Sequence, residues 1–331
     1  MHALTDNRII LVTRPTRLAE LVARFNTVAQ ARFYLEHLGA DFSDYQREDD
    51  TYQMALASAH SILAQLGLVQ VIDRGFLPNF IFGPEDTVVT LGQDGLVANT
   101  LKYLDGQQVV GLNPDPKRWD GRLLPFRVED VGKVIPEVFA RRRSTKTVTM
   151  AKASLNDGQT LYAVNDLFVG PKSHCSARYV IRSGAASEMQ SSSGVIISTG
   201  LGSSGWFKSL LTGAAAVSRA VGPVFGRGRP GREGAPNGDS VGARVQTQVK
   251  TEFPWDSDQL FFTVREPFPT NTTGASLVFG PVTRDAPLIV ESQMPEHGVI
   301  FSDGIEKDFL EFNSGSKAVI TVAERKGVLV V

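Results

Sequence analysis

The first 130 residues alternate short apolar runs with segments of helical spacing, and this alternation limits the possible fold more than any other feature of the sequence. The apolar runs suit strands that are buried on both faces; they are Ile9–Val12, Leu68–Ile72, Thr87–Leu91 and Val109–Leu112. Helical patterns lie between them, over residues 18–29, 44–66 and 96–104. Strands separated by helices predict a parallel sheet with right-handed crossovers, and ligands bind such sheets beyond the carboxyl ends of the strands.

The pattern changes at about Lys146, where short β-rich segments begin to dominate. They lie at 147–150, 161–164, 177–181, 194–198 and 260–264, with several more near the C-terminus. They predict a second, mainly β domain. We therefore expect a Rossmann-like parallel α/β domain over residues 1–135 and a β-rich, sandwich-like domain over 136–331, whose C-terminal tail packs back on the first domain.

Composition excludes several classes of function. The formal net charge of the 331 residues is −1, which gives no overall attraction to nucleic acid or to an anionic membrane. No apolar run approaches the length of a membrane span, and no apolar stretch precedes Ile9, so we expect a cytoplasmic protein without a secretory signal. An anionic ligand must therefore be held by local geometry.

The potential metal ligands are few. Cys175 is the single cysteine, so neither an intrachain disulfide nor a thiolate cluster can form. His174 beside Cys175 is compatible with a metal-ligand pair or a catalytic couple, but neighbouring residues of a strand point to opposite faces, which favours an ordinary structural role. The sequence does not identify a metal site.

Residues 222–242 are rich in Gly, Pro and Arg. They are compatible with a mobile lid that brings Arg227, Arg229 or Arg232 to a phosphate. The composition favours the other interpretation, a flexible surface insertion, because the segment cannot bury enough apolar surface to fold by itself.

A Gly-Gln-Asp-Gly turn closes the apolar run Thr87–Leu91 and opens a helix. Gly92 and Gly95 let a phosphate approach the backbone, and the free N–H groups of the following helix favour an anion. Asp94 would repel that phosphate, so it is better explained as a base for an attacking hydroxyl or as a magnesium contact. An ordinary turn is the alternative.

Residues 198–206, STGLGSSGW, follow a strand and precede a helix. The glycine spacing matches the dinucleotide fingerprint, yet no acid follows about 20 residues later, so a Rossmann dehydrogenase is a poor explanation. G-x-S-x-G is absent from the loop, so a hydrolase nucleophile elbow is unsupported. Small residues, hydroxyls and Trp206 can still hold a nucleotide by backbone contacts and stacking.

Asn165 and Asp166 follow the β-rich segment 161–164. An amide beside a carboxylate suits vicinal sugar hydroxyls, because the amide both donates and accepts while the carboxylate accepts. Taken alone, the pair is more simply explained as a turn.

The order of these elements resembles the NAD kinase family, within the wider group that includes diacylglycerol kinases. Residues 111–121, GLNPDPKRWDG, look like the GxNTDPxRSxG segment of the organellar branch of that family. Residues 262–267, FTVREP, look like the branch's IREP segment, and residues 301–304, FSDG, resemble the family's late DG turn. The resemblance covers nearly the whole chain.

The resemblance implies an active site in the cleft between the two domains and a role for each matched residue. Asp94 would be the base acting on the 2′-hydroxyl of the adenosine ribose of NAD, with ATP and Mg²⁺ as the phosphoryl donor. The residues at the ATP phosphates would be Gly92, Gln93, Gly95 and Asn113. The residues that bind NAD would be Asn165, Asp166, Ser198, Thr199, Gly202, Ser203, Ser204 and Trp206. The resemblance also implies a homodimer or a higher homo-oligomer.

The chain departs from the family at the turn itself, where GGDGT is replaced by GQDGL. Gln93 resists the positive φ that a glycine allows, and Leu96 removes a hydroxyl from the helix start. Two alternatives therefore stand beside an NAD kinase. One is a kinase of the same fold for another nucleoside, sugar or lipid acceptor, and the other is an NAD-binding regulator with weakened catalysis.

Overall fold

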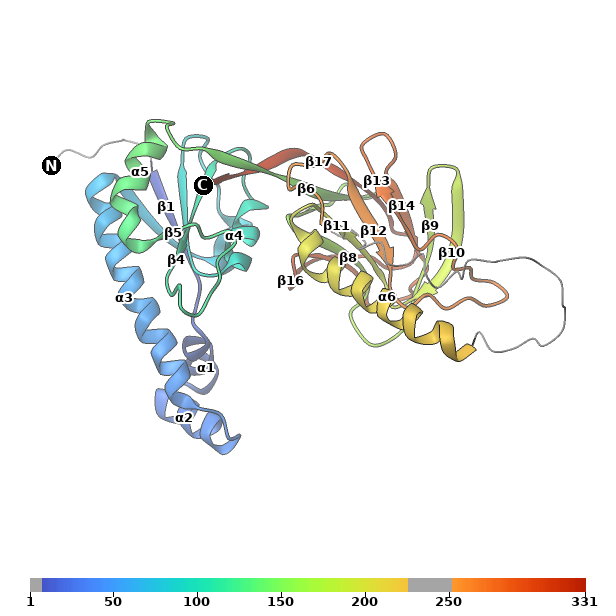
Figure 1. Ribbon diagram of the computed structural model, residues 1–331, viewed down its shortest axis with the longest axis horizontal. Coiled ribbons are helices and arrows are strands. Elements are labelled where there is room, and N and C mark those ends of the chain that lie inside the picture. The colour runs from blue at the N-terminus through green and yellow to red at the C-terminus, as the bar shows by residue number, and fades with distance from the viewer. Residues whose placement is uncertain (1–7, 226–251) are drawn as a thin grey trace. The chain divides into compact units, whose positions relative to one another are not determined.

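The computed structural model describes residues 8–225 and 252–331, which divide into two compact units (Figure 1). Unit 1 comprises Met1–Met150 and Glu324–Val331, and unit 2 comprises Ala151–Ala323. Arg227, Arg229 and Arg232, on which the lid hypothesis depends, lie outside the described residues. Within the described ranges, none of the helices has both the length and the apolar composition that crossing a lipid bilayer requires.

Unit 1 is an α/β unit. Its elements are β1 (Arg8–Thr13), α1 (Arg17–Phe25), α2 (Val28–His37), α3 (Phe42–Leu66), β2 (Leu68–Asp73), η1 (Arg74–Asn79), β3 (Thr87–Leu91), α4 (Asp94–Leu101), β4 (Gln108–Asn113), β5 (Phe126–Arg127), η2 (Val128–Asp130) and α5 (Val131–Phe139). The strands β4, β3, β1 and β2 lie side by side in this order and pair in parallel, as the alternating pattern predicts.

Helices cover both faces of this sheet. Figure 1 shows α3 and α5 on one face and α4 on the other. Residues Ile9–Val12 of β1 are fully buried, because neither face of the strand meets solvent. Ala59 and Leu63 of α3 pack on Leu11 and Val89 in the core of the unit.

The helix predicted over residues 18–29 is in fact two helices. Asn26 has φ 68° and ends α1, because this left-handed conformation cannot continue a right-handed helix. Thr27 then begins α2, and its hydroxyl accepts the N–H of Gln30 at 3.1 Å. The apolar spacing continues across the break, which is why periodicity alone joins the two helices.

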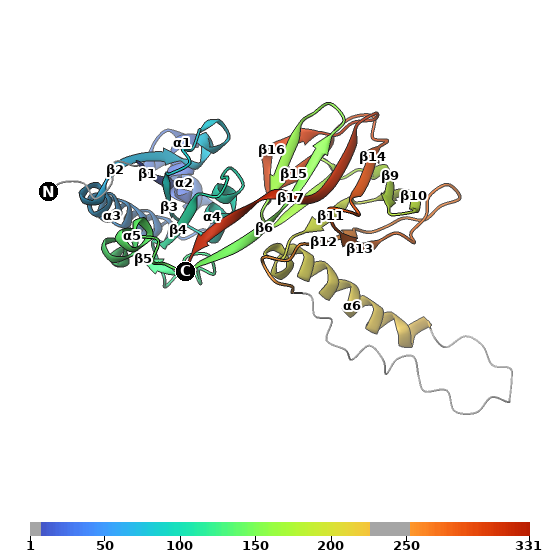
Figure 2. The same cartoon turned by 90° about the horizontal axis from the view of Figure 1, so that it is seen from above.

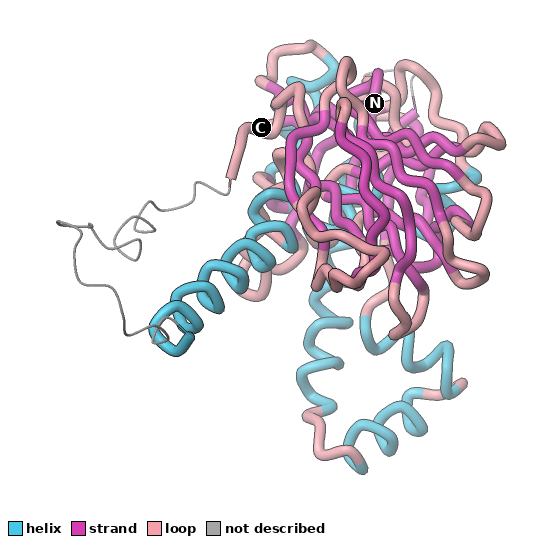
Figure 3. The backbone as a smooth tube through the Cα atoms, turned by 90° about the vertical axis from the view of Figure 1, so that its right-hand side faces the viewer, coloured by secondary structure: helices cyan, strands magenta, loops and turns pink. Residues whose placement is uncertain are grey.

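Unit 2 consists mainly of strands, and α6 is the single α-helix among its described residues (Figure 3). Its elements are β7 (Thr160–Ala163), β8 (Asp166–Pro171), β9 (Ala177–Ser183), β10 (Ala186–Ser192), β11 (Val195–Ser198), η3 (Gly202–Ser204), α6 (Trp206–Phe225), β12 (Leu260–Val264), β13 (Phe279–Val282), β14 (Leu288–Ser292), β15 (Gly298–Ser302) and β16 (Ile305–Glu311). The long strands β6 (Thr145–Leu155) and β17 (Lys317–Val330) pair with each other and contribute residues to both units (Figure 2).

The strands of unit 2 form a sandwich. One sheet has the order β13-β12-β11-β8-β15-β16, and the strands β10, β9, β14 and β17 belong to the other. Leu167 and Phe262 of the first sheet and Tyr179 and Val290 of the second share one buried core. The opposite face of the first sheet carries α6, whose Phe207 ring lies 6.4 Å from that of Phe261. Every residue of β8 and β11 is buried, so neither of these two strands has a face that is open to solvent.

Tyr52 ties α3 to two strand ends of unit 1. Its hydroxyl donates to the carbonyl of Leu91 at 3.0 Å and accepts the N–H of Arg14 at 3.1 Å. We expect Tyr52→Phe to lower the free energy of unfolding by about 1–3 kcal/mol, because the buried groups lose their partner. Urea denaturation measures this, with Tyr45→Phe on the same helix as the control. Equal effects of the two substitutions would contradict the assignment.

Candidate active site

The strand order of unit 1 has a topological switch point between β1 and β3. From β1 the chain goes to β2 on one side of β1. From β2 it crosses to β3 on the other side of β1, so the crossovers diverge between β1 and β3. In open α/β sheets ligands bind at the carboxyl ends of the strands at such a switch point. Arg14 follows β1 and Gly92 follows β3, and a Cβ atom added to Gly92 would lie 3.5 Å from Cδ of Arg14.

The Gly-Gln-Asp-Gly turn lies at this switch point in an unstrained conformation. The N–H of Gly92 donates to the carbonyl of Leu112 at 3.3 Å, and a Cβ atom on Gly92 would come within 2.9 Å of the Leu96 side chain. Gln93 has φ −108° and ψ 166°, an extended backbone that any residue adopts. The turn therefore does not require a positive φ at Gln93, and the penalty that such a conformation would carry does not arise.

Asp94 has a fixed orientation at the start of α4. Its carboxylate accepts the N–H of Leu123 at 2.8 Å and that of Arg122 at 3.2 Å. Each carboxylate oxygen has a second lone pair, so the group can still accept a proton or a hydroxyl. Asp94, Gly92, Gln93 and Gly95 are together at one strand end, as the sequence suggests.

The segment that holds Asp94 depends on close backbone packing against β4. A Cβ atom on Gly111 would lie 2.1 Å from the carbonyl oxygen of Leu123, so only glycine lets this segment pass. Asn113, at the end of β4, is buried, and its side chain donates to the Trp119 carbonyl at 2.9 Å and accepts the Asp115 N–H at 3.1 Å. Asn113 thus shapes the loop, and a direct contact with a phosphate remains a prediction.

Arg14 is a candidate phosphate-binding residue that the sequence analysis did not identify. Its side chain is 9% exposed, its guanidinium donates to Glu48 at 3.2 Å and to the Pro15 carbonyl at 3.1 Å, and it lies over the ring of Tyr52. The signal was an arginine directly after the first strand, at the sheet edge where ligands bind.

In unit 2, the backbone around Asn165 is held from two sides. The carboxylate of Asp303 accepts the N–H groups of Val164, Asn165 and Asp166 at 3.0, 2.6 and 3.4 Å. The N–H of Thr199 donates to the Asn165 carbonyl at 2.9 Å. Asp303 has φ 56° and belongs to the late Asp-Gly turn. The hydrogen bonds that its carboxylate accepts show that this turn fixes the backbone around Asn165, which the sequence did not reveal.

The side chains of Asn165 and Asp166 contrast with their backbone, because neither forms a hydrogen bond to another described residue. Asp166 is 7% exposed. Burial, and then the charge of Asp303, raise the pKa of Asp166 to about 7. A buried acid without a partner costs stability, and such groups cluster at functional sites.

The hydroxyls of residues 198–204 are committed to the protein itself. They donate to backbone carbonyls in the pairs Ser198 to Thr199 (3.1 Å), Thr199 to Val164 (2.5 Å), Ser203 to Gly200 (2.6 Å) and Ser204 to Leu201 (3.3 Å). A Cβ atom on Gly202 would lie 2.0 Å from the Asn165 carbonyl oxygen. This loop therefore supports Asn165, and contacts from these hydroxyls to NAD remain a prediction.

A cavity of about 890 Å³ opens on the outer face of the six-stranded sheet, two residues along β8 from Asp166. Trp206 stacks on Phe168 at 5.8 Å, with Arg265 5.4 Å from the Trp206 ring centre. The remaining lining residues include Lys172, Ser173, His174, Cys175, Ser176, Ser193, Phe301 and Phe309. Aromatic rings and cations without an acid suit a planar, anionic ligand.

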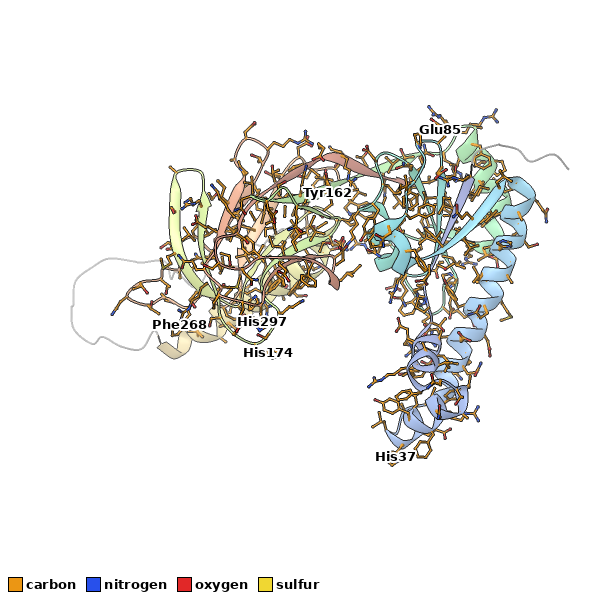
Figure 4. The ribbon with its side chains drawn as sticks, turned by 180° about the vertical axis from the view of Figure 1, so that it is seen from behind. His37, Glu85, Tyr162, His174, Phe268 and His297 are labelled. Atoms are coloured by element: carbon orange, nitrogen blue, oxygen red, sulfur yellow. The ribbon has the colours of Figure 1, made fainter. Side chains whose placement is uncertain are left out.

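His174 and Cys175 are among the residues that line this cavity. Figure 4 shows His174 near His297, whose carbonyl accepts the N–H of Lys172 at 2.8 Å. Over the part of the chain that the structure describes, no three His, Cys, Asp or Glu residues gather as metal ligands.

Asp166 gives a stability test of the unit 2 site. Its folded pKa of about 7 exceeds its ordinary 3.8, so its contribution to stability is fully present below pH 4 and is lost as the pH rises through 7. The side chain of Asp166→Asn carries no charge, so we expect this variant to have a higher Tm than the wild type at pH 8. The gain in the free energy of unfolding is at most about 4 kcal/mol at pH 8, and we expect little change in Tm at pH 4. Thermal scans of this variant and of the exposed control Asp256→Asn measure the effect. A gain equal at both pH values would contradict it.

Comparisons with known proteins agree on the fold. No protein-family model matches the chain, and no curated protein sequence matches it. An NAD kinase from Archaeoglobus fulgidus, solved in complex with ATP, is 14% identical over 98% of this chain and 93% of its own, with a TM-score of 0.50. A yeast NADH kinase, solved with NADH, is 15% identical over 99% of this chain and 84% of its own, with a TM-score of 0.54. The chain therefore has the fold of the NAD kinases, an N-terminal α/β domain joined to a β-rich domain.

Proposed function

We propose that the protein is an ATP-dependent NAD kinase, which phosphorylates the 2′-hydroxyl of the adenosine ribose of NAD to give NADP. The observation that carries the proposal is the carboxylate of Asp94, which two backbone N–H groups orient at the switch point of unit 1. The fold that the chain shares with two kinases, one solved with ATP and the other with NADH, supports this assignment.

Asp94 would act as the general base. It would take the proton of the 2′-hydroxyl while the hydroxyl oxygen attacks the γ-phosphorus of ATP. The bond from that phosphorus to the bridging oxygen then breaks, ADP leaves, and Asp94 releases its proton to solvent. Such transfers need little covalent chemistry from the protein, so the orientation of Asp94 is the main requirement.

The phosphates of the donor would lie against the start of α4 and near Arg14. Gly95 is open at this point, because a Cβ atom there would meet nothing within 4 Å. The N–H groups of the first helical turn and the nearby guanidinium both favour an anion. Mg²⁺ usually keeps several waters and binds one or two carboxylates together with substrate phosphates. The triphosphate of ATP would therefore hold the ion, and the ion would offset part of the negative charge of the triphosphate.

Unit 2 would supply the contacts to NAD. The unpartnered side chains of Asn165 and Asp166 suit the ribose hydroxyls, and a neutral Asp166 can donate as well as accept. Trp206, in the aromatic wall of the cavity, would stack on the adenosine side of NAD.

A kinase for another nucleoside, sugar or lipid acceptor is the second candidate. A weakened regulator is the third, and Leu96 is what favours it. Leu96 is buried against Gly92, in place of the hydroxyl that the family turn carries. The backbone of Gln93 adds no support to the regulator, because it is extended.

The proposal also includes features that the sequence alone suggests. They are membership of the organellar branch of the NAD kinases, a cytoplasmic location and a homodimer or higher homo-oligomer. Analytical ultracentrifugation of the purified protein tests the last of these.

Asp94→Asn tests the catalytic assignment. We expect NADP to form from NAD, ATP and Mg²⁺, and we expect kcat to fall by about 10²–10⁴-fold in this variant, because a general base contributes that much. An NADP-specific dehydrogenase measures the product, and Asp105→Asn, just beyond the end of α4, is the control. Polyphosphate and NADH, tested in parallel, define the donor and the acceptor.

The outcomes of this assay separate the candidates. A folded protein that binds NAD but forms no NADP with either donor would support the regulator. Consumption of ATP without NADP would indicate another acceptor. Unchanged kcat in Asp94→Asn would remove Asp94 from the mechanism.

Asn165→Ala tests the NAD contact in unit 2. We expect the Kd for NAD to rise by about 10-fold, because a hydrogen bond to a ribose hydroxyl is lost. Calorimetric titration measures it, with Asn271→Ala in an exposed loop as the control. An unchanged Kd would show that NAD does not contact Asn165.

A further inference from the structure

Three arginines of unit 1 are held by two acids of one helix. Glu48 and Asp44 lie one turn apart on α3. Glu48 pairs with Arg14 and Arg17, and Asp44 pairs with Arg17 and Arg118. Arg14 follows β1, Arg17 begins α1 and Arg118 belongs to the loop after β4, so the acids connect segments that are distant in sequence.

The pair of Asp44 and Arg118 has fork geometry. Nη1 of Arg118 donates to one carboxylate oxygen of Asp44 at 3.2 Å, and Nη2 donates to the other. Arg17 donates to the same carboxylate at 2.7 Å, and Arg47 lies 3.7 Å from it. The hydrogen bonds from Arg118 and then from Arg17 hold the pKa of Asp44 well below its ordinary value, so Asp44 stays charged at any working pH.

The loop connects this pair to Asp94. Arg118 lies four residues before Arg122, whose N–H reaches Asp94 at 3.2 Å. Leu123 is anchored separately, because it is buried and its carbonyl packs on Gly111. Arg122 is exposed and has no such anchor, so its position depends on the loop before it.

We infer that Asp44 is a positioning residue, which fixes the loop after β4 through Arg118 and thereby the N–H of Arg122, one of the two that orient Asp94. The inference rests on the proposed function only for its catalytic consequence. Partly exposed ion pairs contribute little to stability, and the side chains of Asp44 and Arg118 are 35% and 24% exposed. The effect of the pair should therefore appear in the catalytic turn and not in the stability of unit 1.

Amide hydrogen exchange tests this without any enzymatic assay. In Asp44→Asn we expect the amide of Arg122 to exchange about 10-fold faster, as it should in Asp94→Asn, because this part of the segment loses its fixed position. The amides of Val88 and Val89 in β3 should keep their rates. Asp50→Asn, an exposed acid of the same helix that bonds only Gln46 among the described residues, is the matched control.

Kinetics give the second readout. We expect Asp44→Asn to lower kcat by about 10-fold with KM for NAD unchanged, because a misplaced base slows the chemical step and not substrate binding. The double variant Asp44→Asn/Arg118→Gln should be no slower than Asp44→Asn alone, since Asp44→Asn already removes the pair with Arg118. Arg118→Lys keeps the charge but not the two parallel hydrogen bonds, so its kcat should lie between those of Arg118→Gln and the wild type.

Any other outcome of these experiments overturns either the positioning role of Asp44 or the proposed function. Unchanged exchange at Arg122 in Asp44→Asn, with faster exchange in Asp94→Asn, would overturn the inference. Faster exchange in β3 as well would also overturn it, because the pair would then hold the whole unit. If exchange changes as expected but the wild-type protein forms no NADP, the positioning role stands and the proposed function fails.

Discussion

The hydrogen bonds from two backbone N–H groups to one carboxylate are the interaction on which the proposed chemistry of this protein depends. Asp94 receives them from Arg122 and Leu123, which belong to the segment that follows β4. That segment can approach only because Gly111 has no side chain, and the loop before it is held by Asn113. A base at a helix start is thus fixed by residues from a neighbouring strand and its loop, not by its own helix.

Unit 2 prepares its candidate binding residues in a different way. There the backbone is over-determined, since Asp303 and Thr199 hold the chain around Asn165, while the side chains of Asn165 and Asp166 stay unpartnered among the described residues. The hydroxyl-rich loop that follows β11 uses its own polar groups for support. A rigid backbone lowers the entropy that is lost on binding, because only the side chains of Asn165 and Asp166 have to be ordered.

Local patterns predict much of this fold, and contacts between distant segments limit the rest. Buried apolar runs predict the strands of unit 1, and the turn at Asp94 is visible because glycines and an acid follow such a run. The break between α1 and α2 is missed because apolar spacing continues across Asn26. The ion pair of Arg14 is with Glu48, 34 residues away in sequence. Asp303 accepts the N–H of Asn165, 138 residues away. Local sequence patterns do not reveal contacts at such separations.

The extended backbone of Gln93 has a consequence for how such a turn can diversify. A position that requires a positive φ accepts little except glycine, but φ −108° is open to any side chain. Its side chain can therefore change in size, polarity or charge while the peptide path into α4 stays the same. The residue beside the proposed base is thus a place where selection, or an engineer, can change the side chain without rebuilding the scaffold.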